Sequence, residues 1–220
     1  MHICEGALSG STSGIVVLAV GAAVTVVGTA LGLRKLDYER VPRVALLSAA
    51  FFVASFLDIP LGPTNIHPLL TGLIGLCLGW AAFPALLVAL FLQTFFQFGG
   101  LTTLGINTAV MALPAVACHY LYGWAVRGEN EGVAAIAGLA AGATGVMFSA
   151  VLLCAALLTA GSEYRAISAA VLGVNLLLAL AEGAVTASAV VFLRKVAAEV
   201  LDSSLLLAGP LVKETGRECL

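Results

Sequence analysis

The stretch RKLDYERVPR, residues 34–43, carries four of the ten basic side chains of a 220-residue chain and separates two long apolar segments. Overall, 61% of the residues are hydrophobic, only 10% are charged, and the mean hydropathy is +1.09. A soluble domain is roughly 45–50% apolar and about 25% charged. The composition therefore predicts an integral membrane protein, with the lipid bilayer as its surroundings. A net charge of −2 argues against a nucleic-acid partner.

Seven apolar segments can be drawn along the chain, and each is a candidate membrane helix. They span residues 14–33, 42–61, 68–80, 81–98, 104–126, 132–160 and 166–193. The third is short and rich in glycine, so residues 68–98 are either two abbreviated helices or one span beside a broken neighbour. The expected fold is an all-α membrane protein, a seven-transmembrane-helix bundle over residues 1–195. A cytoplasmic C-terminal tail, residues 196–220, follows it.

The basic residues set the expected orientation, because cytoplasmic loops are enriched in Lys and Arg. With seven spans, nine of the ten basic residues fall on one side of the membrane and only Arg165 falls on the other. This split predicts an N-terminus outside and a C-terminus in the cytoplasm. Six spans would spoil the split, so the charge pattern also favours seven.

Polar residues inside the spans are few, and polar groups in lipid are costly enough to suggest function. We expect most of them to hydrogen-bond within the bundle, among them His119 near the cytoplasmic half of the fifth span. Asn175 and Glu182 are seven residues apart and share a helix face. They leave a proton-coupled secondary transporter as one alternative. The sequence contains no Ser/His/Asp or paired-acid motif and no CxxC pair, so an enzyme is disfavoured and no catalytic cofactor is expected.

The chain opens with MHICEG, residues 1–6, and no positively charged region precedes the first apolar run. We therefore expect no signal cleavage and a retained Met1. The Met1 amine, the His2 backbone nitrogen and the His2 imidazole can chelate one metal, and His67, expected on the same outer face, could supply a fourth nitrogen. A planar set of nitrogens suits Ni²⁺, Cu²⁺ or low-spin Co²⁺. The alternative interpretation is a histidine on a disordered terminus.

Three stretches resemble the signatures of the CbiM/NikM family, the substrate-capture membrane components of energy-coupling-factor importers for cobalt and nickel. They are MHICEG at residues 1–6, GPTNIHPLLTGLIGLCLG at residues 62–79, and FQFGGLTTLGINTAVMALPA at residues 96–115. The motifs occur in the family's order, and the resemblance covers about residues 1–195. One departure is Cys4, which stands where the family usually has proline.

The resemblance implies a seven-helix bundle whose N-terminal segment tucks into its outer mouth. It implies a metal held by Met1, His2 and His67, with Thr64, Asn65, Thr103 and Asn107 supporting the tucked segment. Co²⁺, with Ni²⁺ as the alternative, would be the transported substrate. The implied partners are a transmembrane coupling subunit, two cytoplasmic ATPase subunits and a small membrane accessory subunit, in the bacterial inner membrane. The chain itself contains no GxxxxGK[ST] phosphate-binding motif.

Overall fold

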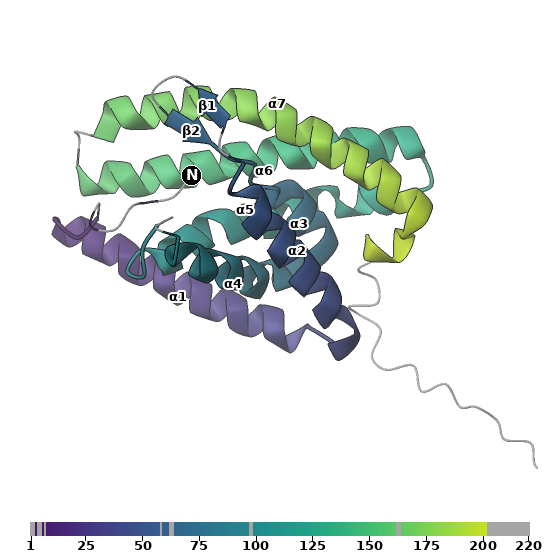
Figure 1. The fold of residues 1–220 in the computed structure, drawn as a ribbon, viewed down its shortest axis with the longest axis horizontal. Coiled ribbons are helices and arrows are strands. Elements are labelled where there is room, and N and C mark those ends of the chain that lie inside the picture. Colours follow the sequence, from purple (N-terminus) through teal and green to yellow (C-terminus); the bar gives the residue numbers. More distant parts are fainter. Residues whose placement is uncertain are drawn as a thin grey trace, which may run out of the picture.

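The computed structural model describes residues 3, 6, 8–57, 59–61, 64–96, 99–161 and 164–201. Met1 and His2, the predicted metal ligands, and Cys4, which departs from the family motif, lie outside these residues. The described chain is predominantly helical (Figure 1). Its α-helices are α1 (Thr12–Arg34), α2 (Val41–Ala54), α3 (Thr71–Leu78), α4 (Ala82–Thr94), α5 (Leu104–Arg127), α6 (Glu131–Ala160) and α7 (Arg165–Val196).

Short elements join these helices. Single 3-10 turns lie at η1 (Tyr38–Arg40), η2 (Gly79–Ala81) and η4 (Ala198–Val200). Two short strands, β1 (Ile59–Leu61) and β2 (Thr64–Ile66), form an antiparallel hairpin after α2. The predicted second span, 42–61, was therefore too long, because α2 ends at Ala54 and residues 59–61 pair as a strand.

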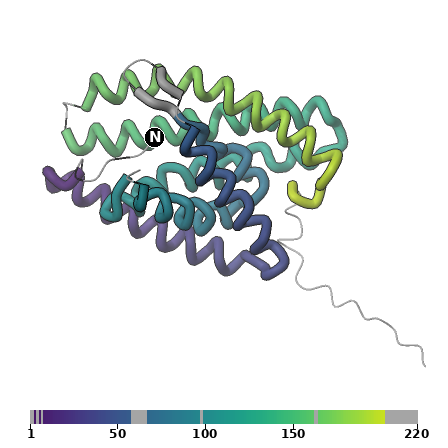
Figure 2. The backbone as a smooth tube through the Cα atoms, viewed as in Figure 1, coloured from purple at the N-terminus to yellow at the C-terminus, as the bar shows by residue number. Residues whose placement is uncertain are grey.

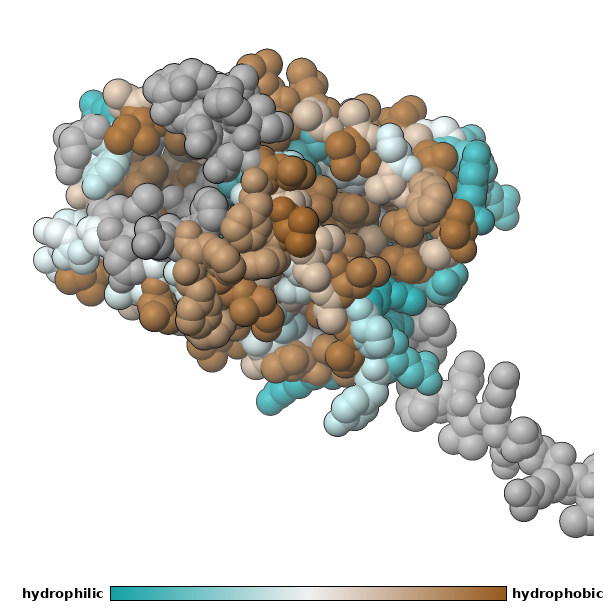
Figure 3. Space-filling model, viewed as in Figure 1, coloured by the Kyte–Doolittle hydropathy of each residue, from teal (hydrophilic) through white to brown (hydrophobic). Residues whose placement is uncertain are grey.

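Five helical stretches among the described residues are long and apolar enough to cross a membrane. They are Thr12–Arg34, Thr71–Thr94, Leu104–Arg127, Glu131–Ala160 and Arg165–Val196. Figure 3 shows apolar side chains over most of the visible face, with hydrophilic ones gathered toward its right-hand end. The protein is thus a multi-pass membrane protein, as the composition predicted. The number of seven crossings and the orientation of the termini, both inferred from the sequence, remain predictions.

The stretch Thr71–Thr94 is not one straight helix. Gly79 has φ +53° and ψ −122°, a conformation that favours glycine and interrupts the helix between α3 and α4. Gly75 packs against Ala115, and Gly79 packs against His119, so α3 runs in the same direction as α5. Trp80, just before α4, packs against Gly32, and Phe83 in α4 packs against the earlier Gly28, so α4 runs opposite to α1.

Ile106 packs against Gly21, and Trp80 contacts both Lys35 and Tyr120, so α1 and α5 run in the same direction. Because α3 runs with α5 and α4 runs opposite to α1, α3 and α4 are antiparallel to each other. The chain therefore reverses direction at Gly79–Ala81. The predicted segments 68–80 and 81–98 are two abbreviated helices, which was one of the two alternatives for this region. With eight residues, α3 is about 12 Å long and reaches through only part of the bundle.

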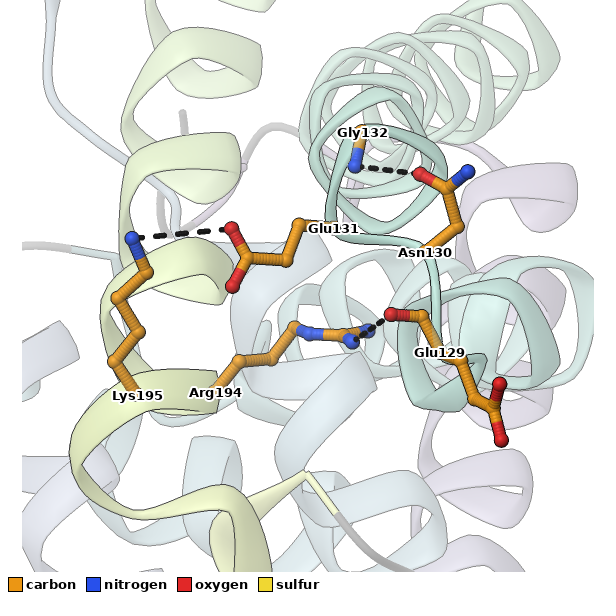
Figure 4. Close-up of polar contacts among 6 residues, drawn as sticks. All are labelled: Glu129, Asn130, Glu131, Gly132, Arg194 and Lys195. Atoms are coloured by element: carbon orange, nitrogen blue, oxygen red, sulfur yellow. Dashed lines mark hydrogen bonds and ion pairs between the residues drawn. The ribbon is translucent and has the colours of Figure 1, made fainter.

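The two longest helices, α6 and α7, lie side by side as an antiparallel pair (Figure 2). A core of small and aliphatic side chains, with the buried rings of Phe51 and Phe83, fills the space between α3, α4, α5 and α6. At the end of the bundle where α7 finishes, Arg194 donates hydrogen bonds to the carbonyl groups of Val126, Gly128 and Glu129 (Figure 4 draws the last). The predicted tail does not leave the bundle at once, because Leu201 is buried and its carbonyl accepts a hydrogen bond from Arg127.

Candidate metal site

The N-terminal segment is held to the bundle at Ile3. The Asn107 side chain accepts a hydrogen bond from the Ile3 N–H at 2.8 Å and donates one to the Ile3 carbonyl at 3.1 Å. The Ile3 side chain is 2% exposed and packs in a cluster with Leu8, Ile106 and Leu157. Ile3, the residue that follows His2, is therefore held in place by the first turns of α5.

Thr103 supports Asn107 from the preceding turn. Its hydroxyl donates to the Gly100 carbonyl at 3.2 Å and accepts a hydrogen bond from the Asn107 Nδ2 at 3.3 Å. Both Thr103 and Asn107 are buried. These contacts orient the Asn107 amide, so that its oxygen faces the Ile3 N–H and its nitrogen faces the Ile3 carbonyl.

The predicted supporting residues Thr64 and Asn65 belong to strand β2, where they pair with Leu61 and Pro60. Their side chains lie outside what the structure describes. The backbone pairing folds the connection between α2 and α3 back on itself just before His67. The hairpin was not predicted, because each of its strands is only three residues long and no alternating pattern can be recognised over so few positions.

His67 lies between β2 and α3 and is 4% exposed. Burial lowers the pKa of its imidazole to about 3, so the ring is neutral at neutral pH. Its Nδ1 lies 3.2 Å from the Pro68 carbonyl oxygen. With the proton on Nδ1 this contact is a hydrogen bond and the lone pair is on Nε2, which is the arrangement found in metal-binding histidines.

The Ile3 and His67 segments lie toward the same end of the bundle. Helices α3 and α5 run in parallel, with Gly75 beside Ala115 and Gly79 beside His119. The start of α3, which follows His67, is therefore on the side of the start of α5, where Asn107 holds Ile3. Among the described residues, no group of three or more His, Cys, Asp or Glu side chains could hold a metal ion.

Glu182 of α7 reaches the segment that follows His67. Its carboxylate accepts hydrogen bonds from the backbone N–H groups of Leu69 and Leu70. Asn175, on the same face of α7, donates to the Val171 carbonyl within its own helix at 2.7 Å. The expectation that these two residues bond within the bundle is met by these contacts. The His119 ring packs against Gly79 and edge-on to Tyr120.

The chain is similar to a family of metal transport proteins. The family described as "Cobalt uptake substrate-specific transmembrane region", CbiM, matches residues 2–200. The cobalt transport protein CbiM of Sorangium cellulosum is 33% identical over 172 residues, which are 73% of this chain and 76% of that protein. The "Putative metal transport protein" of Haemophilus influenzae is 50% identical over 123 residues, 56% of this chain and 57% of that protein.

The fused nickel transport protein NikMN of Rhodobacter capsulatus is 39% identical over 141 residues, and the match covers 39% of that protein. The matches cover 57% of the Haemophilus influenzae protein and 39% of NikMN, so the chain spans only part of the length of these two relatives. The crystal structure of a truncated transition metal transporter has the same fold, with a TM-score of 0.63 and 24% identity over 89% of this chain and 99% of that one. Because the family match covers nearly the whole sequence, the chain belongs to the CbiM family of cobalt-uptake transmembrane proteins.

Proposed function

We propose that this protein captures Co²⁺ or Ni²⁺ outside the cell and delivers it to an ATP-driven importer of the energy-coupling-factor class. The observation that carries the proposal is the pair of hydrogen bonds between Asn107 and Ile3, which fix the backbone directly after His2. The buried, neutral imidazole of His67 follows the hairpin at the same end of the bundle. A fixed N-terminal segment and a neutral histidine are what a nitrogen-donor site needs.

In the proposed site, four nitrogens bind the metal: the Met1 amine, the His2 backbone nitrogen, the His2 imidazole and the His67 imidazole. The first three close a five-membered and a six-membered ring around the ion. Four nitrogens in a plane favour Ni²⁺, Cu²⁺ and low-spin Co²⁺ over Mg²⁺ and Ca²⁺, which prefer oxygen. They also disfavour Zn²⁺, which prefers a tetrahedron. The family match and the CbiM relative favour cobalt as the physiological substrate, with nickel as the alternative.

We further propose seven membrane crossings, with α2 and the short α3 completed by their adjoining connections. The N-terminus is then outside and the C-terminus is in the cytoplasm. The charge split supports this orientation, because Arg127, Arg194 and Lys195 lie at one end of the bundle. Power comes from partners: a transmembrane coupling subunit, two ATPase subunits and a small membrane accessory subunit. The cytoplasmic membrane of a bacterium is the proposed location.

A five-residue extension without histidine before Met1 tests the chelate. The extension moves the free amine away from the His2 nitrogens, so the five-membered ring cannot form. A single added residue would not serve, because a histidine in third place chelates Ni²⁺ with the amine and two backbone amides. We expect Co²⁺ and Ni²⁺ affinity, measured by titration calorimetry in detergent, to fall by more than the roughly 10- to 100-fold that loss of a residue supporting the ligands costs. The same five residues added after Leu220 are the matched control and should leave affinity unchanged. Tight binding by the N-terminally extended protein would disprove the chelate.

His67→Ala tests the fourth ligand, because it leaves the other three nitrogens in place. We expect weaker binding and a changed visible spectrum of bound Ni²⁺, with the helical circular dichroism of the folded protein retained. Uptake of Co²⁺ and Ni²⁺ by cells that express the chain together with its proposed partners then separates the two substrates. Uptake that persists without the ATPase subunits and is abolished by a protonophore would favour a proton-coupled transporter instead.

A further inference from the structure

The segment from His67 to Leu70 enters α3 through an unusual backbone turn. Leu70 has φ +50° and is the one non-glycine residue of the described chain with a positive φ. It occupies the N-cap position of α3, where an aliphatic side chain offers no hydrogen-bond acceptor. The N–H groups of this turn are therefore left without an acceptor from the helix itself. Buried backbone donors need partners, so another element must supply one.

Glu182 supplies the acceptor from α7. Its Oε1 accepts the Leu69 N–H at 2.5 Å, and Leu70 N–H donates to both carboxylate oxygens at 3.1 and 3.0 Å. Glu182 is 2% exposed, so these bonds lie in the interior of the bundle. A buried carboxylate that accepts backbone donors is a strong and geometrically exact anchor. The turn after His67 is thus bound to the longest helix of the protein.

The contacts of His67 and Glu182 meet on one peptide group. The peptide between Pro68 and Leu69 presents its carbonyl to the His67 Nδ1 at 3.2 Å and its N–H to the Glu182 Oε1. A peptide group is planar, so fixing the N–H also fixes the direction of the carbonyl. Hydrogen bonds in such a chain also polarise one another.

We infer that Glu182 is a positioning residue for metal capture, which sets the orientation and the tautomer of His67 through the Pro68–Leu69 peptide. The carboxylate holds the peptide so that its carbonyl accepts a proton from Nδ1, and the lone pair is then on Nε2. Partners of this kind fix the ring and raise the basicity of a metal-binding histidine. The inference rests on the proposed function for its consequence in metal binding, but the effect on the tautomer can be measured without metal.

The matched pair Glu182→Gln and Glu182→Met separates hydrogen bonding from packing. Both side chains have nearly the size of glutamate, but only glutamine keeps an oxygen that accepts the Leu69 N–H. We measure the histidine ¹⁵N chemical shifts of the metal-free protein, with His67 assigned by His67→Gln. We expect the wild type and E182Q to hold the proton on Nδ1, and E182M to show a mixture of tautomers. Asn175→Ala, on the same face of α7, should leave the tautomer unchanged.

Metal titration completes the test. We expect E182M to bind Ni²⁺ about tenfold more weakly, with E182Q between it and the wild type. The amides of Leu69 and Leu70 should exchange with deuterium faster in E182M. If E182M does not fold, Glu182→Asp keeps the charge but withdraws the carboxylate, and should give an intermediate mixture of tautomers.

Unchanged ¹⁵N shifts and unchanged Ni²⁺ affinity in E182M or E182D would overturn the inference. An altered tautomer with no loss of affinity would overturn the positioning role in metal capture. Failure of the proposed function looks different. The wild-type protein would then bind no metal, or His67→Ala would bind as well as the wild type, while the effect of Glu182 on the His67 tautomer persisted.

Discussion

Asn107 and Ile3 are joined by two hydrogen bonds, in which one side-chain amide pairs with both the N–H and the carbonyl of a single residue. The two residues are 104 positions apart in the sequence, so this contact ties the N-terminal segment to α5. In the proposed function, it sets where the Met1 amine and the His2 nitrogens can go.

Asn107→Ala removes both bonds and leaves the Ile3 N–H and carbonyl buried without their partner. We expect the free energy of unfolding to fall by about 1–3 kcal/mol, and Co²⁺ and Ni²⁺ affinity to fall with it. Thermal unfolding in detergent and metal titration measure the two effects. Thr108→Val is the control, because the bond that the Thr108 hydroxyl makes among the described residues lies within its own helix, to the Leu104 carbonyl. Wild-type affinity in the Asn107 variant would contradict this role.

Close contact between α3 and α5 depends on Gly75. A Cβ atom at this position would overlap the backbone carbonyl of Ala115, which cannot move aside as a flexible side chain could. We expect Gly75→Ala to destabilise the protein by about 1–3 kcal/mol, as overpacking of a core usually does. Gly173→Ala in α7 is the control, since in the described part of the chain nothing beyond the surrounding helix backbone lies within 4 Å of a Cβ atom there. Equal melting temperatures for the two variants would disprove the close approach.

The positions of the helices were largely predictable, because a segment that crosses the bilayer must be apolar and hydropathy detects such segments. The predicted segments 104–126 and 132–160 match α5 (Leu104–Arg127) and α6 (Glu131–Ala160) closely. The predicted segment 42–61 failed at its second half, where apolar residues form a hairpin and not a helix. Hydropathy cannot separate these outcomes, because a short apolar run is compatible with either structure.

The partners of the polar residues were less predictable than the helices. Helical spacing placed Asn175 and Glu182 on one face of α7, and the structure has both of them buried there. It could not indicate that Glu182 accepts hydrogen bonds from Leu69 and Leu70, more than a hundred residues away. Such contacts depend on how α3 and α7 pack in three dimensions, and no local pattern in either segment encodes them. Asn107 is one of the few polar residues inside the predicted spans, but its role in supporting the N-terminal segment was implied only by the resemblance to a family motif.

Acidification should destabilise the metal-free protein through His67. Burial lowers the pKa of its imidazole from 6.5 to about 3, so the folded state disfavours the proton that the unfolded state accepts. The resulting contribution to stability is complete above about pH 6.5 and is lost as the pH falls toward 3. We expect His67→Gln, which does not titrate, to lose less stability over this window. Melting temperatures at pH 7, 5.5 and 4 measure the difference, and parallel pH profiles would contradict the prediction.

Metal binding should release a number of protons that identifies the ligands. Below about pH 6.5, the Met1 amine, the His2 backbone amide and the His2 imidazole each lose a proton on binding. His67 adds none, because its low pKa keeps it neutral until far lower pH. We therefore expect about three protons per Ni²⁺ at pH 5.5. Calorimetry in buffers with different ionisation enthalpies counts them, and a release of four would show that His67 is protonated before it binds.

Arg194 and Lys195 are adjacent basic residues at the end of α7, but they should differ in their effect on stability. Arg194 donates to the carbonyls of Val126 and Gly128, both at 2.6 Å, and of Glu129 at 3.1 Å, and so closes the turn between α5 and α6 (Figure 4). Lys195 makes an exposed ion pair with Glu131 at 3.8 Å. We expect Arg194→Ala to cost about 1.5–3 kcal/mol of unfolding free energy, the range for hydrogen bonds to a charged group.

Lys195→Ala should cost no more than about 1 kcal/mol, because an exposed pair is screened by solvent. The two variants remove the same charge from the same end of the bundle. A difference between their melting temperatures therefore reports the carbonyl contacts of Arg194 and not the charge itself. Arg194→Lys refines the comparison, since a lysine keeps the charge but cannot present a planar group to three carbonyls at once. Similar losses for Arg194→Ala and Lys195→Ala would show that the turn between α5 and α6 does not depend on Arg194.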